Sequence, residues 1–179
     1  MTECIALLRG INVGRAKRIA MSDLRDLVTG LGHRNVRTLL NSGNVVFEAK
    51  GARPGKLAID IRAAIEEECG VSAHVVVVTA ADLRAAIDEN PLPVADPPRF
   101  LVAFVADPVQ LEGAKALVAK SWAPERMAVG SRAAYLWCAN GIIESKLLKA
   151  FVRATGEAAT TRNWATVLKL DATLKSSRQ

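Results

Sequence analysis

The chain shows the same order of strand-like apolar runs and helix-periodic stretches twice. This repetition constrains its fold more than any other feature. Short strand-like runs alternate with stretches whose apolar residues recur at helical spacing, a pattern typical of mixed α and β proteins. The first set predicts strands at 4–11, 36–41, 44–49 and 73–79, and helices from Ser22 to Gly30 and over 56–69. This order predicts the ferredoxin-like βαββαβ unit, in which two helices cover one face of an antiparallel sheet.

The second set follows a proline-rich stretch. Residues 90–98 contain four of the seven prolines, which interrupt helices and central strands, so we interpret them as a linker. The later elements are expected at 99–106, 109–120, 125–131, 133–139, 144–155 and 161–174. We predict a helix for the last, because Trp164 and Val167 lie at helical spacing. The predicted fold is α+β: two ferredoxin-like halves (1–89 and 99–179) joined by a proline-rich linker, with antiparallel sheets covered by helices.

Composition restricts the cellular context. Three widely spaced cysteines, Cys4, Cys69 and Cys138, form neither a disulfide framework nor a zinc-binding pair, so we expect buried thiols in a reducing cytoplasm. The N-terminal segment lacks the pattern of a secretory signal, and apolar runs such as 75–78 are too short to span a bilayer. We therefore expect a cytoplasmic protein without a membrane partner.

The residue types needed for metal binding or nucleophilic catalysis are sparse. His33 and His74 are the only histidines, and with three scattered cysteines they predict no metal site and no cofactor. A nucleophilic Ser42 would need a nearby base that the sequence does not identify. Whether the protein is an enzyme stays open.

A basic loop after the first strand is the strongest candidate for function. Between Glu3 and Asp23 the chain carries four basic side chains and no acid. The loop lies between a strand and a helix, where glycines let backbone N–H groups converge and the helix N-terminus favours anions. Its glycine spacing matches neither a Walker A loop nor a dinucleotide fingerprint. The sequence thus suggests an anion cradle; the alternative is a solvated loop whose glycines only make turns.

Two further segments add candidate contacts. Asn41 and Asn44 flank a predicted tight turn at Ser42 and Gly43, which by itself explains their residue types. Arg162 lies at the start of the predicted last helix, where a cation opposes the helix dipole and suggests an anion contact, while Thr160 or Thr161 can cap that helix. The candidate ligand-binding residues are Arg9, Asn12, Gly14, Arg15, Lys17, Arg18, Asn41, Asn44 and Arg162.

Three stretches together resemble a known bacterial family. They are the runs Ala6 to Gly14, Asn41 to Phe47, and Thr160 to Leu170. The chain is similar over nearly its whole length to the family catalogued as domain of unknown function 1697. The resemblance implies a pair of ferredoxin-like subdomains and brings no established activity. Arg15 departs from the family pattern, which commonly has glycine there.

Three functional hypotheses remain at this point. The leading one is binding of a phosphate-bearing ligand, either nucleic acid or a nucleotide, since the formal net charge is +6. The second is an enzyme acting on a phosphorylated small molecule, and the third is a structural or interaction protein, including a homo-oligomer paired through its sheets. Tyr135 and Trp137 could stack nucleic-acid bases, but we favour a core position for them.

Overall fold

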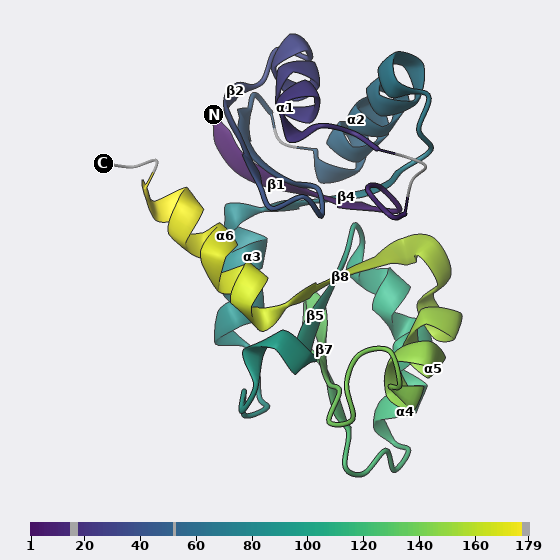
Figure 1. Cartoon of the computed structure of the whole chain (residues 1–179). Helices are drawn as coiled ribbons and strands as arrows, with labels where there is room; N and C mark the ends of the chain where they lie inside the picture. The colour runs from purple at the N-terminus through teal and green to yellow at the C-terminus, as the bar shows by residue number, and fades with distance from the viewer. Residues whose placement is uncertain (15–17, 52, 177–179) are drawn as a thin grey trace. The chain divides into compact units, whose positions relative to one another are not determined.

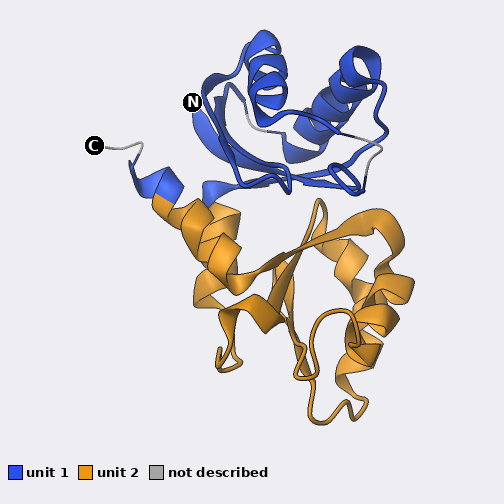
Figure 2. Cartoon of the chain, in the orientation of Figure 1, with its two compact units in different colours: residues 1–80, 173–179 blue, residues 81–172 orange. Residues whose placement is uncertain are grey.

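The computed structural model describes residues 1–14, 18–51 and 53–176 of the chain (Figure 1). The chain divides into two compact units, residues 1–80 with 173–179 and residues 81–172 (Figure 2). Each unit contains a four-stranded antiparallel sheet with helices packed against it. The predicted α+β class is confirmed.

The first unit follows the predicted order of elements. They are β1 (Thr2–Arg9), α1 (Met21–Gly30), β2 (Arg34–Leu39), β3 (Asn44–Ala49), α2 (Pro54–Cys69) and β4 (His74–Thr79). The strands lie in the order β2-β3-β1-β4, and each neighbouring pair is antiparallel. At the centre, Ile5 pairs with Val46 on one side and with Val78 on the other.

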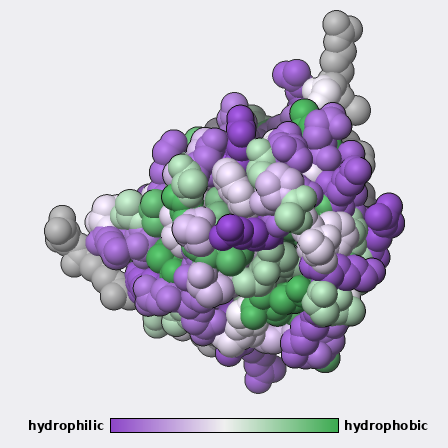
Figure 3. All heavy atoms as spheres, turned by 90° about the horizontal axis from the view of Figure 1, so that it is seen from below, coloured by the Kyte–Doolittle hydropathy of each residue, from purple (hydrophilic) through white to green (hydrophobic). Residues whose placement is uncertain are grey.

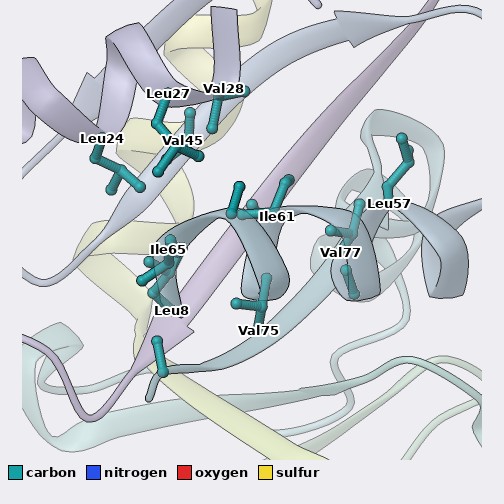
Figure 4. Close-up of a cluster of buried hydrophobic side chains, with 14 of the residues drawn as sticks. Leu8, Leu24, Leu27, Val28, Val45, Leu57, Ile61, Ile65, Val75 and Val77 are labelled. Carbon is teal, nitrogen blue, oxygen red and sulfur yellow. The ribbon is translucent and has the colours of Figure 1, made fainter. Parts of the chain in front are cut away.

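The core of the first unit lies between one sheet face and helices α1 and α2 (Figure 4). Alternate residues of a strand point to the same face, so Leu8 lies on one face with Val45 and Val75 and meets α2 through Ile61 and Ile65. These side chains are at most 7% exposed. Burial of such apolar groups stabilises the unit by about 25 cal/mol per Å² removed from water.

The second unit contains the same arrangement of strands. Its elements are α3 (Ala80–Asp88, of which Ala80 is assigned to the first unit), η1 (Pro97–Arg99), β5 (Phe100–Val105), η2 (Pro108–Leu111), α4 (Glu112–Val118), β6 (Arg126–Val129), β7 (Ala133–Trp137), α5 (Lys146–Thr155), η3 (Gly156–Ala158), β8 (Ala159–Asn163) and α6 (Trp164–Ser176, of which 173–176 are assigned to the first unit). The strand order is β6-β7-β5-β8. Residues 90–98 lie within this unit, between the end of α3 and the first two residues of η1, and their role as a joint stays a prediction.

Helices cover both faces of the second sheet (Figure 1). Leu101 and Ala103 face α4 and α5 in one apolar cluster. On the opposite face, the Tyr135 hydroxyl donates a hydrogen bond of 2.8 Å to the Ala86 carbonyl of α3. Phe100 meets Trp164 of α6 edge-to-face, with ring centroids 5.5 Å apart. The core position favoured for both aromatics holds for Tyr135, which is fully buried, whereas Trp137 is half-buried.

The predicted final helix was wrong at its start. Residues 159–163 form strand β8, in which Thr160 pairs with Phe104 and Asn163 pairs with Leu101. Helix α6 begins only at Trp164, and the Asn163 side chain accepts a 2.9 Å hydrogen bond from the Thr166 N–H. Asn163 therefore caps this helix, in place of the predicted threonines, because strand pairing holds both threonines in β8.

Two boundaries in the first unit also differ from prediction. Helix α1 begins at Met21, so Ser22 lies inside the helix and Ala20 is its N-cap residue. Strand β2 ends at Leu39, since Leu40 adopts a left-handed backbone (φ +60°) that starts a longer turn through Gly43.

Over the part of the chain that the structure describes, no helix is both long enough and apolar enough to cross a membrane. On the face seen in Figure 3, hydrophobic residues are interspersed with hydrophilic ones.

Candidate anion-binding site

A pocket of about 450 Å³ opens in the first unit beside the N-terminus of α1. Three segments form it: the loop after β1, the start of α1 and the turn between β2 and β3. Its lining residues are Asn12, Arg18, Ile19, Ala20, Met21 and Asn41. Three of the predicted ligand-binding residues, Asn12, Arg18 and Asn41, are thus brought together. We call this cavity the α1 pocket.

Asn12 holds the basic loop closed. Its side-chain Nδ2 donates to the carbonyls of Ile19 (3.1 Å) and Asn41 (2.9 Å), and its Oδ1 accepts from the Ile19 N–H (2.8 Å). Its backbone is left-handed (φ +54°), which asparagine tolerates better than most residues. The side chain that we predicted as a ligand contact therefore fixes two walls of the α1 pocket to each other.

The turn between β2 and β3 is locked against the same loop. Asn44 is fully buried, and its Nδ2 donates to the Leu39 carbonyl (2.7 Å) and to Ser42 Oγ (3.0 Å). The Gly43 carbonyl accepts from the Leu8 N–H (2.8 Å). Asn44 therefore shapes the turn, and its role as a ligand contact stays a prediction.

Gly43 is required by both conformation and space. Its φ of +80° is unfavourable for residues with a side chain, and a Cβ there would lie 2.6 Å from Ile11 Cδ1 and 2.8 Å from Leu8 Cβ. This close contact packs the β2–β3 turn against Leu8 at the end of β1 and Ile11 in the loop that follows.

The N-terminus of α1 opens onto the α1 pocket without a capping side chain. Its N-cap residue, Ala20, is extended and cannot offer a side-chain acceptor, while the Leu24 N–H is the first to bond within the helix, to the Ala20 carbonyl. N–H groups that precede the first helical bond carry partial positive charge and need an acceptor. The acid Asp23 lies in the first turn and takes a 3.3 Å hydrogen bond from the Ser22 hydroxyl.

Arg18 supplies a charged side chain to the α1 pocket. It is exposed, and its Nε donates to the Gly14 carbonyl at 3.4 Å. Gly14 has a left-handed backbone (φ +66°) with open space around it. Arg9 lies half-buried at the end of β1. Two other predicted members of the basic cradle, Arg15 and Lys17, lie outside the described residues.

Arg162 differs from its prediction. It belongs to β8 in the second unit and is half-buried, whereas the sequence placed it on the outer surface of a helix start. Its Nη1 donates to the Thr161 carbonyl at 2.9 Å. Burial lowers the pKa of Arg162 to about 10, so the side chain is still cationic at neutral pH.

Other groups with possible chemistry have structural surroundings. The His33 ring packs against Phe47 with centroids 4.8 Å apart, and burial lowers its pKa. Among the described residues, no three His, Cys, Asp or Glu side chains are placed to hold a metal ion. Sequence reasoning missed Ile19, Ala20 and Met21 as pocket walls; the only signal was their position between the basic loop and the helix.

The order of strands and the loop geometry define the class: a two-unit α+β protein whose first β–α loop carries the candidate site. The chain belongs to the family described as protein of unknown function (DUF1697), whose model matches residues 1–135. The predicted family is confirmed.

Among solved structures, the chain is similar to the conserved bacterial protein SP0830 from Streptococcus pneumoniae, with a TM-score of 0.74 and 21% identity. The match covers 97% of this chain and 98% of the other, and at this identity it bears on the fold alone. No curated protein matches the chain.

Proposed function

We propose that this protein binds a small phosphate-bearing ligand in the α1 pocket. The observation that carries the proposal is the uncapped N-terminus of α1, which borders a pocket whose charged lining residue, among those that the structure describes, is Arg18. Phosphate oxygens bound to proteins commonly accept hydrogen bonds from helix N-terminal N–H groups and from arginine side chains. Asn41, exposed beside them, offers a further polar contact.

The size and walls of the pocket favour a compact ligand over a polymer. Its volume of about 450 Å³ falls in the range of small-molecule sites. Single-stranded nucleic acids are commonly bound by stacking on exposed sheet aromatics. Tyr135 cannot serve in this way, because it is fully buried and its hydroxyl is bonded within the second unit. We therefore favour a nucleotide or sugar phosphate, with nucleic acid as a competing outcome of the test.

A thermal-shift panel of the full chain tests the proposal. Nucleotides, sugar phosphates, pyrophosphate, short RNA and short DNA are each measured at low and high salt. A ligand that binds the native state raises the melting temperature by mass action. We expect at least one small phosphate compound to raise it at both salt concentrations. Stabilisation only by polymers, and only at low salt, would instead support nucleic-acid binding through counterion release.

Charge-reversal variants locate the site. Arg18→Glu removes a charge-assisted donor and adds repulsion, so the affinity should fall by about tenfold to a hundredfold. Lys50→Glu is the matched control, because Lys50 is exposed just after the end of β3 farthest from the α1 pocket. Equal affinities of the two variants for the same phosphate compound would refute the site.

We further propose that each unit is ferredoxin-like. Support comes from the order of elements, since βαββαβ with strands arranged 2-3-1-4 and antiparallel occurs in both units. A cytoplasmic location is proposed from the three free cysteines, two of which are buried. Hydrogen exchange of the isolated 1–80 segment, compared with the full chain, would test whether a ferredoxin-like unit is stable by itself.

A further inference from the structure

We propose a second ligand site, in the second unit, that takes a small compound carrying a protonated amino group. A pocket of about 510 Å³ lies between the loop after α4 and the loop that leads into α5. Its lining residues are Ser121, Trp122, Ala123, Pro124, Glu125, Asn140, Glu144 and Lys146. We call it the α5 pocket. The inference is independent of the phosphate site proposed above.

Glu125 is the residue that points to a ligand. It is 7% exposed, and its Oε2 accepts a 3.1 Å hydrogen bond from the Leu147 N–H in the first turn of α5. Its other oxygen, Oε1, is buried and has no hydrogen-bond partner among the described residues. A buried carboxylate oxygen without a donor costs free energy. Since Glu125 lines the α5 pocket, its incompletely bonded carboxylate attracts a cation bound there.

The charges around the α5 pocket select for a cation. Two N–H groups in the first turn of α5 already have acceptors, since the Ser145 hydroxyl accepts from the Leu148 N–H in addition to the bond made by Glu125. An anion would therefore find these two N–H groups occupied and a carboxylate beside them. The lining contains two carboxylates, Glu125 and Glu144, and one ammonium, Lys146, which leaves a net charge of −1.

The other walls suit an organic ammonium group. Trp122 is half-buried and held in place by a 2.8 Å hydrogen bond from its Nε1 to the Leu117 carbonyl. Aromatic rings attract cations that lie over their faces. Asn140 adds an amide that can accept from the same ammonium group. Among the described residues no three acidic or metal-ligating side chains cluster, which favours an amine over a metal ion.

Three compounds of matched length test whether charge or shape decides binding in the α5 pocket. The full chain, labelled with ¹⁵N, is titrated with putrescine, with 1,4-butanediol and with succinate, which carry positive, neutral and negative ends. We expect putrescine to shift the amides of residues 121–125 and Leu147 and the Trp122 indole N–H. Because the whole protein has a formal charge of +6, long-range attraction would favour succinate, so a putrescine-specific response reports a local site.

Glu125→Gln tests the mechanism. The glutamine oxygen can still accept from Leu147, while its NH₂ group replaces the free oxygen with a donor. We expect the affinity for putrescine to fall by about tenfold or more, with the amide spectrum otherwise preserved. If that variant does not fold, Glu144→Gln at an exposed wall position is used, and we expect about a threefold loss from the removed charge.

Several results would overturn the proposal. They are equal shifts with all three compounds, no shift with putrescine at millimolar concentration, shifts outside the α5 pocket, or an affinity unchanged in the folded variant.

Discussion

Replacing Asn12 with alanine should destabilise the first unit by about 2.5–4 kcal/mol. The change removes three hydrogen bonds that close the basic loop, two donated to Ile19 and Asn41 and one accepted from Ile19. Each is worth about 0.5–1.5 kcal/mol, and alanine also tolerates the left-handed backbone of +54° poorly, at a cost of about 1 kcal/mol. We take the lower half of the sum, because Asn12 is half-buried and water can replace part of the bonding.

The assay must follow the first unit alone. Trp122, Trp137 and Trp164 all lie in the second unit, so intrinsic fluorescence reports that unit. The first unit is followed by hydrogen exchange of its own amides and by the part of the far-UV circular-dichroism change that does not coincide with the fluorescence transition. In urea, the circular-dichroism transition of Asn12→Ala should move to lower concentration while the fluorescence transition stays in place. The Ile19 amide should exchange faster, because its acceptor is lost.

Two controls separate backbone from side-chain effects. Asn12→Gly tolerates the left-handed backbone and loses only the hydrogen bonds, so it should be less destabilising than alanine. Asn12→Asp keeps the acceptor for Ile19 but places a carboxylate against two carbonyl oxygens, so it should be at least as destabilising. An Asn12→Ala protein within 0.5 kcal/mol of the wild type, with an unchanged Ile19 exchange rate, would refute the closing role of this side chain.

Three further changes test other parts of the structure. Gly43→Ala should cost about 2–4 kcal/mol, because its Cβ would lie 2.6 Å from Ile11 Cδ1; Gly70→Ala, with a similar left-handed backbone and open space, should cost only about 1 kcal/mol in the same urea titration. Burial raises the pKa of Tyr135 to about 12, above its unfolded value near 10, so its contribution to stability is intact below pH 10 and is lost as the pH rises to 12. Tyr135→Phe should lack that part of the alkaline loss, and an identical pH profile for both proteins would contradict the assignment. Asn163→Ala should cost about 1 kcal/mol by uncapping α6, measured by the fluorescence transition, and an unchanged midpoint would rule out the cap.

Much of the fold follows from periodicity. The continuous valine run over 75–78 predicts a strand buried on both faces, and β4 contains it. The final segment was mispredicted because the helical spacing that begins at Trp164 was extended back over Thr160 and Thr161. Their strand state depends on pairing with β5, more than fifty residues earlier, which local sequence does not record.

The candidate site was harder to predict, because loop asparagines carry two kinds of signal. Asn12 and Asn44 lie in or next to glycine-containing loops, as ligand contacts often do, yet the amide groups of both bond backbone carbonyls that hold the loop after β1 and the β2–β3 turn in place. Only the three-dimensional course of the loop distinguishes these roles. Glu125 could not be predicted as a site residue, because it belongs to no motif and its hydrogen-bond partner, Leu147, lies 22 residues away.

The central claim is that a phosphate group binds at the N-terminus of α1. It is tested most directly by titrating the ¹⁵N-labelled full chain with pyrophosphate at high salt and mapping the amide shifts. The account predicts the largest shifts at the backbone amides of residues 20–23 and at the Arg18 side chain, and their loss in Arg18→Glu but not in Lys50→Glu. Shifts centred elsewhere, or none at millimolar pyrophosphate, would contradict it.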